Sequence, residues 1–157
     1  MNKRILVIAN ETTEGSELYE AIRSRTRRDG KVLVIAPALN SRLRYWCSDE
    51  DRARQAAQAR LGESLRRLAG AGIQADGRVG DADPLQATAD ALVSFTADEV
   101  IISTNPTRRP HWLARNLVER ARTRFALPIV HVVADSVSGR DSVLDSRVAL
   151  GRTLAAA

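Results

Sequence analysis

The side chains in this sequence that could do chemistry are mostly hydroxyls, amides and guanidiniums. Most of them gather in one stretch, which contains Ser103, Thr104, Asn105, Arg108, Arg109 and Arg115. Hydroxyls and amides can donate hydrogen bonds to a ligand, and an arginine fork can hold a phosphate or a carboxylate. This stretch therefore suggests binding of a small anion. The competing interpretation is a proline-stiffened surface turn whose arginines are simply solvated.

A second polar stretch, Thr12–Ser16, carries hydroxyls and a glycine just before a predicted helix. Such a loop can hold a phosphate at a helix N-terminus, and Thr12 is its candidate ligand-binding residue. The competing interpretation is that Thr12 or Thr13 only caps the helix, while Glu14 and Glu17 favour its dipole.

Motifs of the common nucleotide enzymes and hydrolases are absent. The sequence has no G-x-G-x-x-G, no G-x-x-x-x-G-K-[ST] and no G-x-S-x-G. Its histidines are His111 and His131, and its single cysteine is Cys47, which gives neither a triad nor a metal framework. We therefore expect no enzymatic activity, no catalytic residue and no metal site.

Composition indicates one soluble domain. The chain has 157 residues, of which 44% are hydrophobic and 27% charged, and no apolar run approaches the ~20 residues of a membrane-spanning helix. The single cysteine and the short N-terminal segment before the first apolar run predict a cytoplasmic protein. The net charge of +5 favours an anionic ligand, but without interleaved aromatic residues we expect no nucleic-acid partner.

Short apolar runs alternate with amphipathic stretches along the chain. The predicted strands are Arg4–Ala9, Lys31–Ala36, Ile73–Val79, Glu99–Ser103 and Pro128–Val133. The predicted helices are 14–28, 51–69, 84–95 and 111–124. Nearly continuous apolar strands are typical of a parallel sheet covered on both faces, so this order predicts a three-layer α/β/α sandwich. The domain would cover residues 1–134, with 135–157 as a C-terminal extension.

Helix ends are marked by familiar residues. Asp83 can cap the third helix, Pro84 suits its first position, and Gln86 can close a capping box. Gly70 and Gly72 are expected to stop the second helix. A group of arginines near the end of the last helix is interpreted as its solvated C-terminal turn, and consists of Arg120, Arg122 and Arg124.

The chain resembles the universal stress protein family over about residues 3–134. The resemblance rests on the element order and on three segments, Val79–Pro84, Leu117–Ala121 and Leu127–Val133. It implies a five-stranded parallel sheet in the order 3-2-1-4-5 and a binding or regulatory role in the stress response.

The resemblance also points to an adenine nucleotide, ATP or AMP, as the ligand. Nucleotide-binding members of the family carry G-x2-G-x9-G-[ST] after the fourth strand. Ser103 and Pro106 stand at the first two glycines, Arg115 and Asn116 at the final pair, and Asn10 where an aspartate is usual. Glycine lets backbone amides surround phosphate, and proline has no N–H. Weak or lost nucleotide binding is therefore expected, with Asn10 and Asn116 added to the candidate residues.

In this strand order the fifth strand lies at an edge of the sheet. An exposed apolar edge invites pairing with another chain. We predict a homodimer through this strand, with Ile129, His131 and Val133 at the interface.

Two alternative functions stay open. The first is a flavodoxin-like electron carrier that holds the FMN phosphate with the Thr12–Ser16 loop. The second is a nucleotide-binding enzyme with weak phosphohydrolase activity, although the loop carboxylates Glu11 and Glu14 do not form an evident metal-binding pair.

Overall fold

A computed structural model describes residues 3–9, 16–26, 30–38, 49–105 and 111–133. Within these ranges strands and helices alternate from the first element to the last. In chain order they are β1 (Arg4–Ala9), α1 (Ser16–Arg25), β2 (Lys31–Pro37), α2 (Asp49–Gly70), β3 (Ala75–Gly80), α3 (Pro84–Ser94), β4 (Glu99–Thr104), α4 (His111–Arg124) and β5 (Ile129–Val133).

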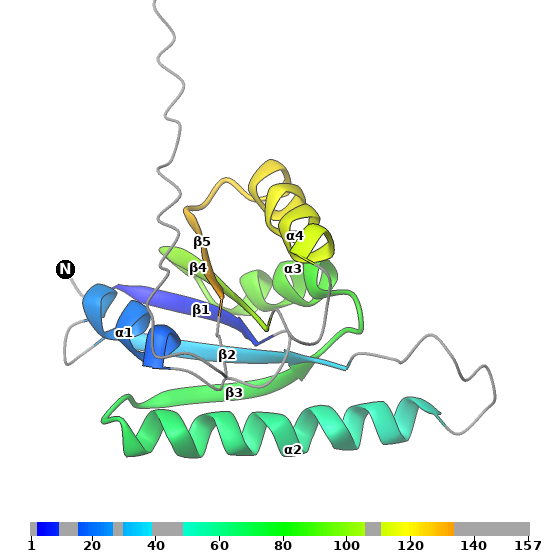
Figure 1. Ribbon diagram of the computed structural model, residues 1–157, viewed down its shortest axis with the longest axis horizontal. Coiled ribbons are helices and arrows are strands. Elements are labelled where there is room, and N and C mark those ends of the chain that lie inside the picture. Colours follow the sequence, from blue (N-terminus) through cyan, green and yellow to red (C-terminus); the bar gives the residue numbers. More distant parts are fainter. Residues whose placement is uncertain (1–2, 10–15, 27–29, 39–48, 106–110, 134–157) are drawn as a thin grey trace, which may run out of the picture.

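The five strands form one parallel sheet in the order β3-β2-β1-β4-β5 (Figure 1). This confirms the predicted fold class and strand order. The central strand β1 pairs with β2 on one side and with β4 on the other. In the register of the sheet, Ile5 lies beside Val32 of β2 and beside Glu99 of β4. The sheet is apolar at its centre because β1 and β4 are buried on both faces, as parallel strands between helix layers require.

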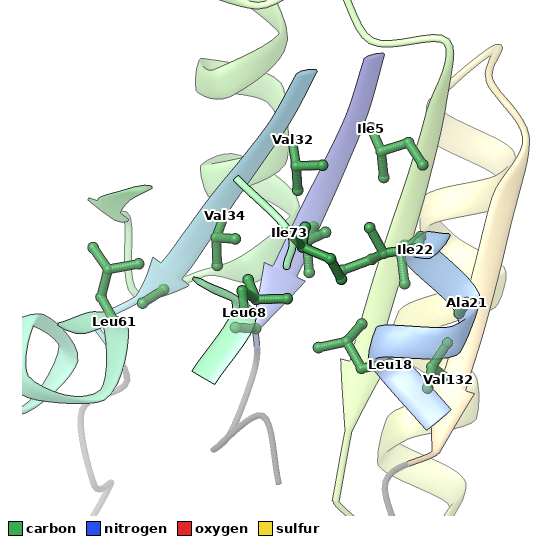
Figure 2. Close-up of a cluster of buried hydrophobic side chains, with 14 of the residues drawn as sticks. Ile5, Leu18, Ala21, Ile22, Val32, Val34, Leu61, Leu68, Ile73 and Val132 are labelled. Carbon is green, nitrogen blue, oxygen red and sulfur yellow. The ribbon is translucent and has the colours of Figure 1, made fainter. Parts of the chain in front are cut away.

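Two helices cover each face of the sheet. The helices α1 and α2 pack on one face, and α3 and α4 pack on the other. Alternate residues of each strand serve the two layers, so that Val7 lies under α1 and α2 while Leu6 lies under α3 and α4. Figure 2 shows the first layer, in which Leu18 and Ile22 of α1 and Leu68 of α2 meet strand residues.

The helix α2 ends in a Schellman motif. The N–H of Ile73 donates to the carbonyl of Leu68 at 2.9 Å, and the N–H of Gly72 donates to that of Ala69 at 2.9 Å. Gly72 has a φ of +77°, in the left-handed region that favours glycine. The predicted stop at Gly70 is confirmed, but the predicted start of β3 at Ile73 is wrong. Ile73 instead closes the motif and packs in the core with Leu68.

The cap of α3 agrees with the sequence in part. The Asp83 carboxylate accepts from the N–H of Leu85 at 2.9 Å, and Pro84 opens the helix. The predicted capping box is not formed. The Asp83 N–H donates to Asp81 Oδ1 at 2.8 Å, while the Gln86 amide donates to Asp90 Oδ1 at 2.8 Å.

Charged groups stabilise the edge of the sheet at which the strands begin, the amino edge. Glu99, at the start of β4, is 7% exposed and pairs with Arg25 at 3.2 Å and with Lys3 at 3.5 Å. The backbone N–H of Arg4 donates to Asp98 Oδ2 at 2.7 Å. These contacts join α1, β1 and β4 away from the carboxyl ends of the strands, where a ligand is expected.

Residues 135–157, the predicted extension, lie outside the described part of the chain, so this domain boundary stays a prediction. No helix in the described ranges combines the length and the apolar character needed to cross a membrane.

Candidate functional site

The candidate site lies at the carboxyl edge of the sheet, where β1 and β4 end side by side. Their register places Ala9 opposite Ser103. The chain leaves β1 toward β2 on one side and leaves β4 toward β5 on the other, so this is the point where the strand order reverses. Parallel sheets bind ligands at such a switch point because the two loops diverge there and leave a crevice.

The end of β4 brings together the three predicted residues Ser103, Thr104 and Asn105. All three are buried, with 1%, 6% and 4% of their surfaces exposed. Strand alternation places Ser103 with Ile101, under α1 and α2, and Thr104 with Ile102, under α3 and α4. The two hydroxyl side chains therefore lie on opposite faces of the sheet.

Thr104 is joined to the neighbouring strand by a side-chain hydrogen bond. Its Oγ1 lies 2.8 Å from Nε2 of His131 on β5. The threonine hydroxyl donates when the imidazole proton is on Nδ1, and it accepts when the proton is on Nε2. The sequence predicted Thr104 as a ligand-binding residue and His131 as a residue of the dimer interface, and it gave no sign of the bond between them.

Two further candidates, Arg115 and Asn116, lie on α4 and are exposed. They come shortly after the start of this helix, which follows the loop from β4. Four other candidates lie outside the described residues, namely Asn10, Thr12, Arg108 and Arg109. The structure therefore brings Ser103, Thr104 and Asn105 together and leaves Arg115 and Asn116 facing solvent.

Glu17 is a buried carboxylate that sequence analysis assigned only to the helix dipole. It lies in the first turn of α1, is 5% exposed, and its Oε2 has no hydrogen-bond partner among the described residues. Because α1 follows β1, its first turn belongs to the carboxyl end of the domain. A buried carboxylate oxygen is stabilised by a donor, such as a hydroxyl or an amine. The sequence holds no signal for this burial.

Gly80 sets the position of α3 beside this edge. A Cβ at this residue would lie 2.7 Å from Cγ2 of Ile35 and 2.8 Å from Cβ of Ala87. Such distances are far shorter than van der Waals contact, so the close packing of β3, β2 and α3 requires a glycine. The segment Val79–Pro84, which carried the family resemblance, therefore has a packing role.

Across the described ranges, no group of three or more histidine, cysteine, aspartate or glutamate side chains is arranged to hold a metal ion. The polar side chains at the end of β4 are hydroxyls and an amide, which are groups that can form hydrogen bonds with an organic molecule.

Comparison with solved structures adds the decisive observation. A universal stress protein family structure from Burkholderia pseudomallei aligns with a TM-score of 0.57 at 14% identity, covering 83% of this chain and 95% of that one. The fold is that of the universal stress proteins. A second such structure, from Arabidopsis thaliana with AMP bound, aligns with a TM-score of 0.52 at 15% identity, covering 85% and 93% of the two chains.

The universal stress protein fold is thus carried by a divergent sequence. No family model and no curated protein sequence matches the chain. At 14% and 15% identity the likeness lies in the strand order and the layers. What the residues at the end of β4 bind must therefore be inferred from their own side chains.

Proposed function

We propose that this chain is a non-enzymatic binding module of the universal stress protein type, which acts in the stress response and binds an adenine nucleotide weakly. The observation that carries the proposal is the carboxyl edge of the sheet in this fold, where β4 ends in a hydroxyl, a second hydroxyl and an amide. AMP bound to the Arabidopsis protein of the same fold supports an adenine nucleotide as the ligand.

Weak binding follows from how the residues at the end of β4 are held. Ser103 is almost fully buried, and the Thr104 hydroxyl already bonds His131. Neither replaces the close backbone approach that a glycine allows. The charge of the phosphate would be met instead by arginines, including the exposed Arg115, and such contacts are screened by salt.

The carboxylate of Glu17 at this edge is suited to bind the sugar of the nucleotide rather than its phosphate. Glu17 offers a buried oxygen that can accept from a hydroxyl, and the ribose of a nucleotide carries two. In this proposal the arginines bind the phosphate of the nucleotide, while Glu17 binds its ribose.

We further propose that the module is a homodimer formed through β5. Among the described strands, β5 has a neighbour on one side only. The Pro128 carbonyl accepts from the N–H of Val100 at 2.9 Å, so alternate residues of β5 direct their backbone groups toward β4. Ile129, His131 and Val133 therefore direct theirs to the open edge, where a second chain could pair.

The nucleotide proposal is tested by calorimetric titration of the purified protein with AMP and with ATP. We expect saturable binding that weakens as salt is raised. Replacing Arg108 and Arg109 together by alanine should weaken binding about tenfold or more, because the proposal assigns both arginines to charged contacts with the phosphate.

The matched control is the double variant Arg52→Ala, Arg54→Ala, which removes the same charge from exposed positions of α2. It should bind AMP as the wild type does. Absence of binding to both nucleotides, with no nucleotide or flavin released from freshly purified protein on denaturation, would refute the ligand assignment. Release of FMN would favour the flavodoxin-like alternative.

A further inference from the structure

The backbone of β5 limits how a second copy of the chain could pair with it. β5 is the last strand of the sheet (Figure 1), and Ile129, His131 and Val133 direct their backbone groups to its open edge. A closed dimer of identical chains has a twofold axis, and two strands that continue one sheet across this axis run antiparallel. In such a pair, residues whose backbones point outward lie opposite one another and exchange both hydrogen bonds.

His131 is the central residue of β5, which runs from Ile129 to Val133. When the whole strand pairs, Ile129 lies opposite Val133 of the partner subunit, and His131 lies opposite His131 of the partner subunit. A register shifted by two residues keeps the backbone directions but leaves one outward residue of each strand outside the paired region. The central register therefore forms the most hydrogen bonds.

In this register both imidazoles lie on the same face of the extended sheet. Residues directly opposite in an antiparallel pair have Cβ atoms about 5 Å apart. His131 lies on the face of α3 and α4, because it alternates with Val130 and Val132 of the other layer. Its Nε2 bonds Thr104 Oγ1 at 2.8 Å, and this bond survives protonation, since an imidazolium donates from Nε2 to the hydroxyl oxygen. The ring is therefore held on the sheet in both charge states.

The charged side chains packed near this position are mostly guanidiniums. On β4, the neighbours on the same face are Ile102 and Thr104, which are uncharged. On α4, which packs on β5, the only carboxylate in the sequence is that of Glu119, and it pairs with Arg122 at 2.7 Å. The other charged residues of α4 are Arg115, Arg120 and Arg124. The helix α1 packs on the opposite face of the sheet, so its charges do not face the imidazole.

We infer, on the basis of the proposed homodimer, that His131 makes the dimer dissociate as the pH falls through about 6.5, where an imidazole titrates. In separate chains each imidazolium is half-exposed and partly hydrated. In the dimer the two lie directly opposite each other, and like charges in this position destabilise a strand pair. Dimer formation therefore releases protons in this range, so that acid favours the single chains and neutral pH the dimer.

Sedimentation equilibrium of the full chain at about pH 8 and about pH 5.5 measures this effect, on either side of the imidazole titration. We expect the dissociation constant of the dimer to rise about tenfold or more at the lower pH, because two like charges are brought together. Added salt should reduce the difference by screening these charges. Circular dichroism at both pH values checks that the chain stays folded, and loss of helix at the lower pH would overturn the inference.

His131→Gln removes the titrating ring, while its amide can still bond Thr104. We expect this variant to be dimeric with the same dissociation constant at both pH values. The matched control is His111→Gln, which removes the only other histidine of the chain and should keep the pH dependence of the wild type. His131→Asn repeats the test with a shorter amide if the first variant does not fold.

A wild type that is dimeric with one dissociation constant at both pH values would overturn the inference and leave the proposed interface intact. Equal pH dependence in the wild type and in His131→Gln would overturn it too, and so would loss of the dependence in His111→Gln, because another group would then be responsible. A chain that is monomeric at about pH 8 would refute the proposed homodimer itself, and the inference with it.

Discussion

The hydrogen bond between Thr104 and His131 is the residue-level feature that links the candidate site to the edge of the sheet. Thr104 is buried and His131 is half-buried, so a lost partner would leave a polar atom poorly solvated. Any ligand that needs the Thr104 hydroxyl has to share it with the imidazole. The pair therefore joins the end of β4 to the strand proposed as the dimer interface.

Thr104→Val tests the contribution of this bond, since the shape is kept and the hydroxyl removed. We expect the free energy of unfolding to fall by about 1 kcal/mol, measured by chemical denaturation. Thr123→Val is the control, because Thr123 is exposed and its hydroxyl donates to the backbone carbonyl of Glu119 in the same helix, at 3.0 Å. An equal loss in both variants would show that the imidazole bond contributes nothing specific.

Residues at strand ends could be predicted from the sequence, because a parallel sheet places all its carboxyl ends together. Ser103, Thr104 and Asn105 were found in this way. The buried Glu17 and the contact between Gln86 and Arg124 could not be found. The latter joins residues 38 apart in the sequence, and no local pattern reports which faces of α3 and α4 meet.

At the scale of elements, the end of α2 determines where β3 begins. The Schellman motif turns the chain at Gly72 and places Ile73 back on the helix, against Leu68. A single residue, Gln74, then connects the motif to Ala75, where β3 starts. The predicted start was two residues early because Ile73 has the apolar character of a strand residue but is used as the contact that completes the motif.

Gly72→Ala should lower the free energy of unfolding by about 1 kcal/mol, because an L side chain is disfavoured at positive φ. Thermal or urea denaturation measures the change. Gly70→Ala is the matched control two residues earlier: a Cβ there would meet no atom within 4 Å, and φ is not positive. Since alanine favours helix, it should not destabilise the protein. A neutral Gly72→Ala would contradict the role given to the turn.

Most element boundaries could be predicted because the periodicity of the apolar residues differs between strands and helices. The five strands and the four helices lie where the alternation placed them, with ends shifted by a few residues. The pattern of apolar residues could not predict which of several possible hydrogen-bond partners a side chain takes. Gln86 is an example, since its amide can close a capping box or bind Asp90, and the second arrangement also holds Arg124.

At the scale of the whole molecule, the proposed homodimer depends on the open edge of β5. A dimer formed through this edge should make the melting temperature rise with protein concentration. Val133→Pro removes an outward N–H at the last residue of the strand, where the preceding residue is already extended. We expect this variant to be monomeric in sedimentation equilibrium.

Val133→Thr retains the N–H and a β-branched side chain, so it should stay dimeric in the same experiment. A wild type that sediments as a monomer would refute the dimer. So would a Val133→Pro variant that still associates, because the edge would then not be the interface.

The strand order also has a consequence for synthesis of the chain. The central strand β1 pairs early with β2, about 27 residues later, but its other partner, β4, follows about 94 residues later. Chains are made from the N-terminus, so β1, β2 and β3 can assemble while β4 is still inside the ribosome. Until residue 104 emerges, the apolar edge of β1 has no neighbour, and the nascent protein is then most exposed to mispairing and to capture by chaperones.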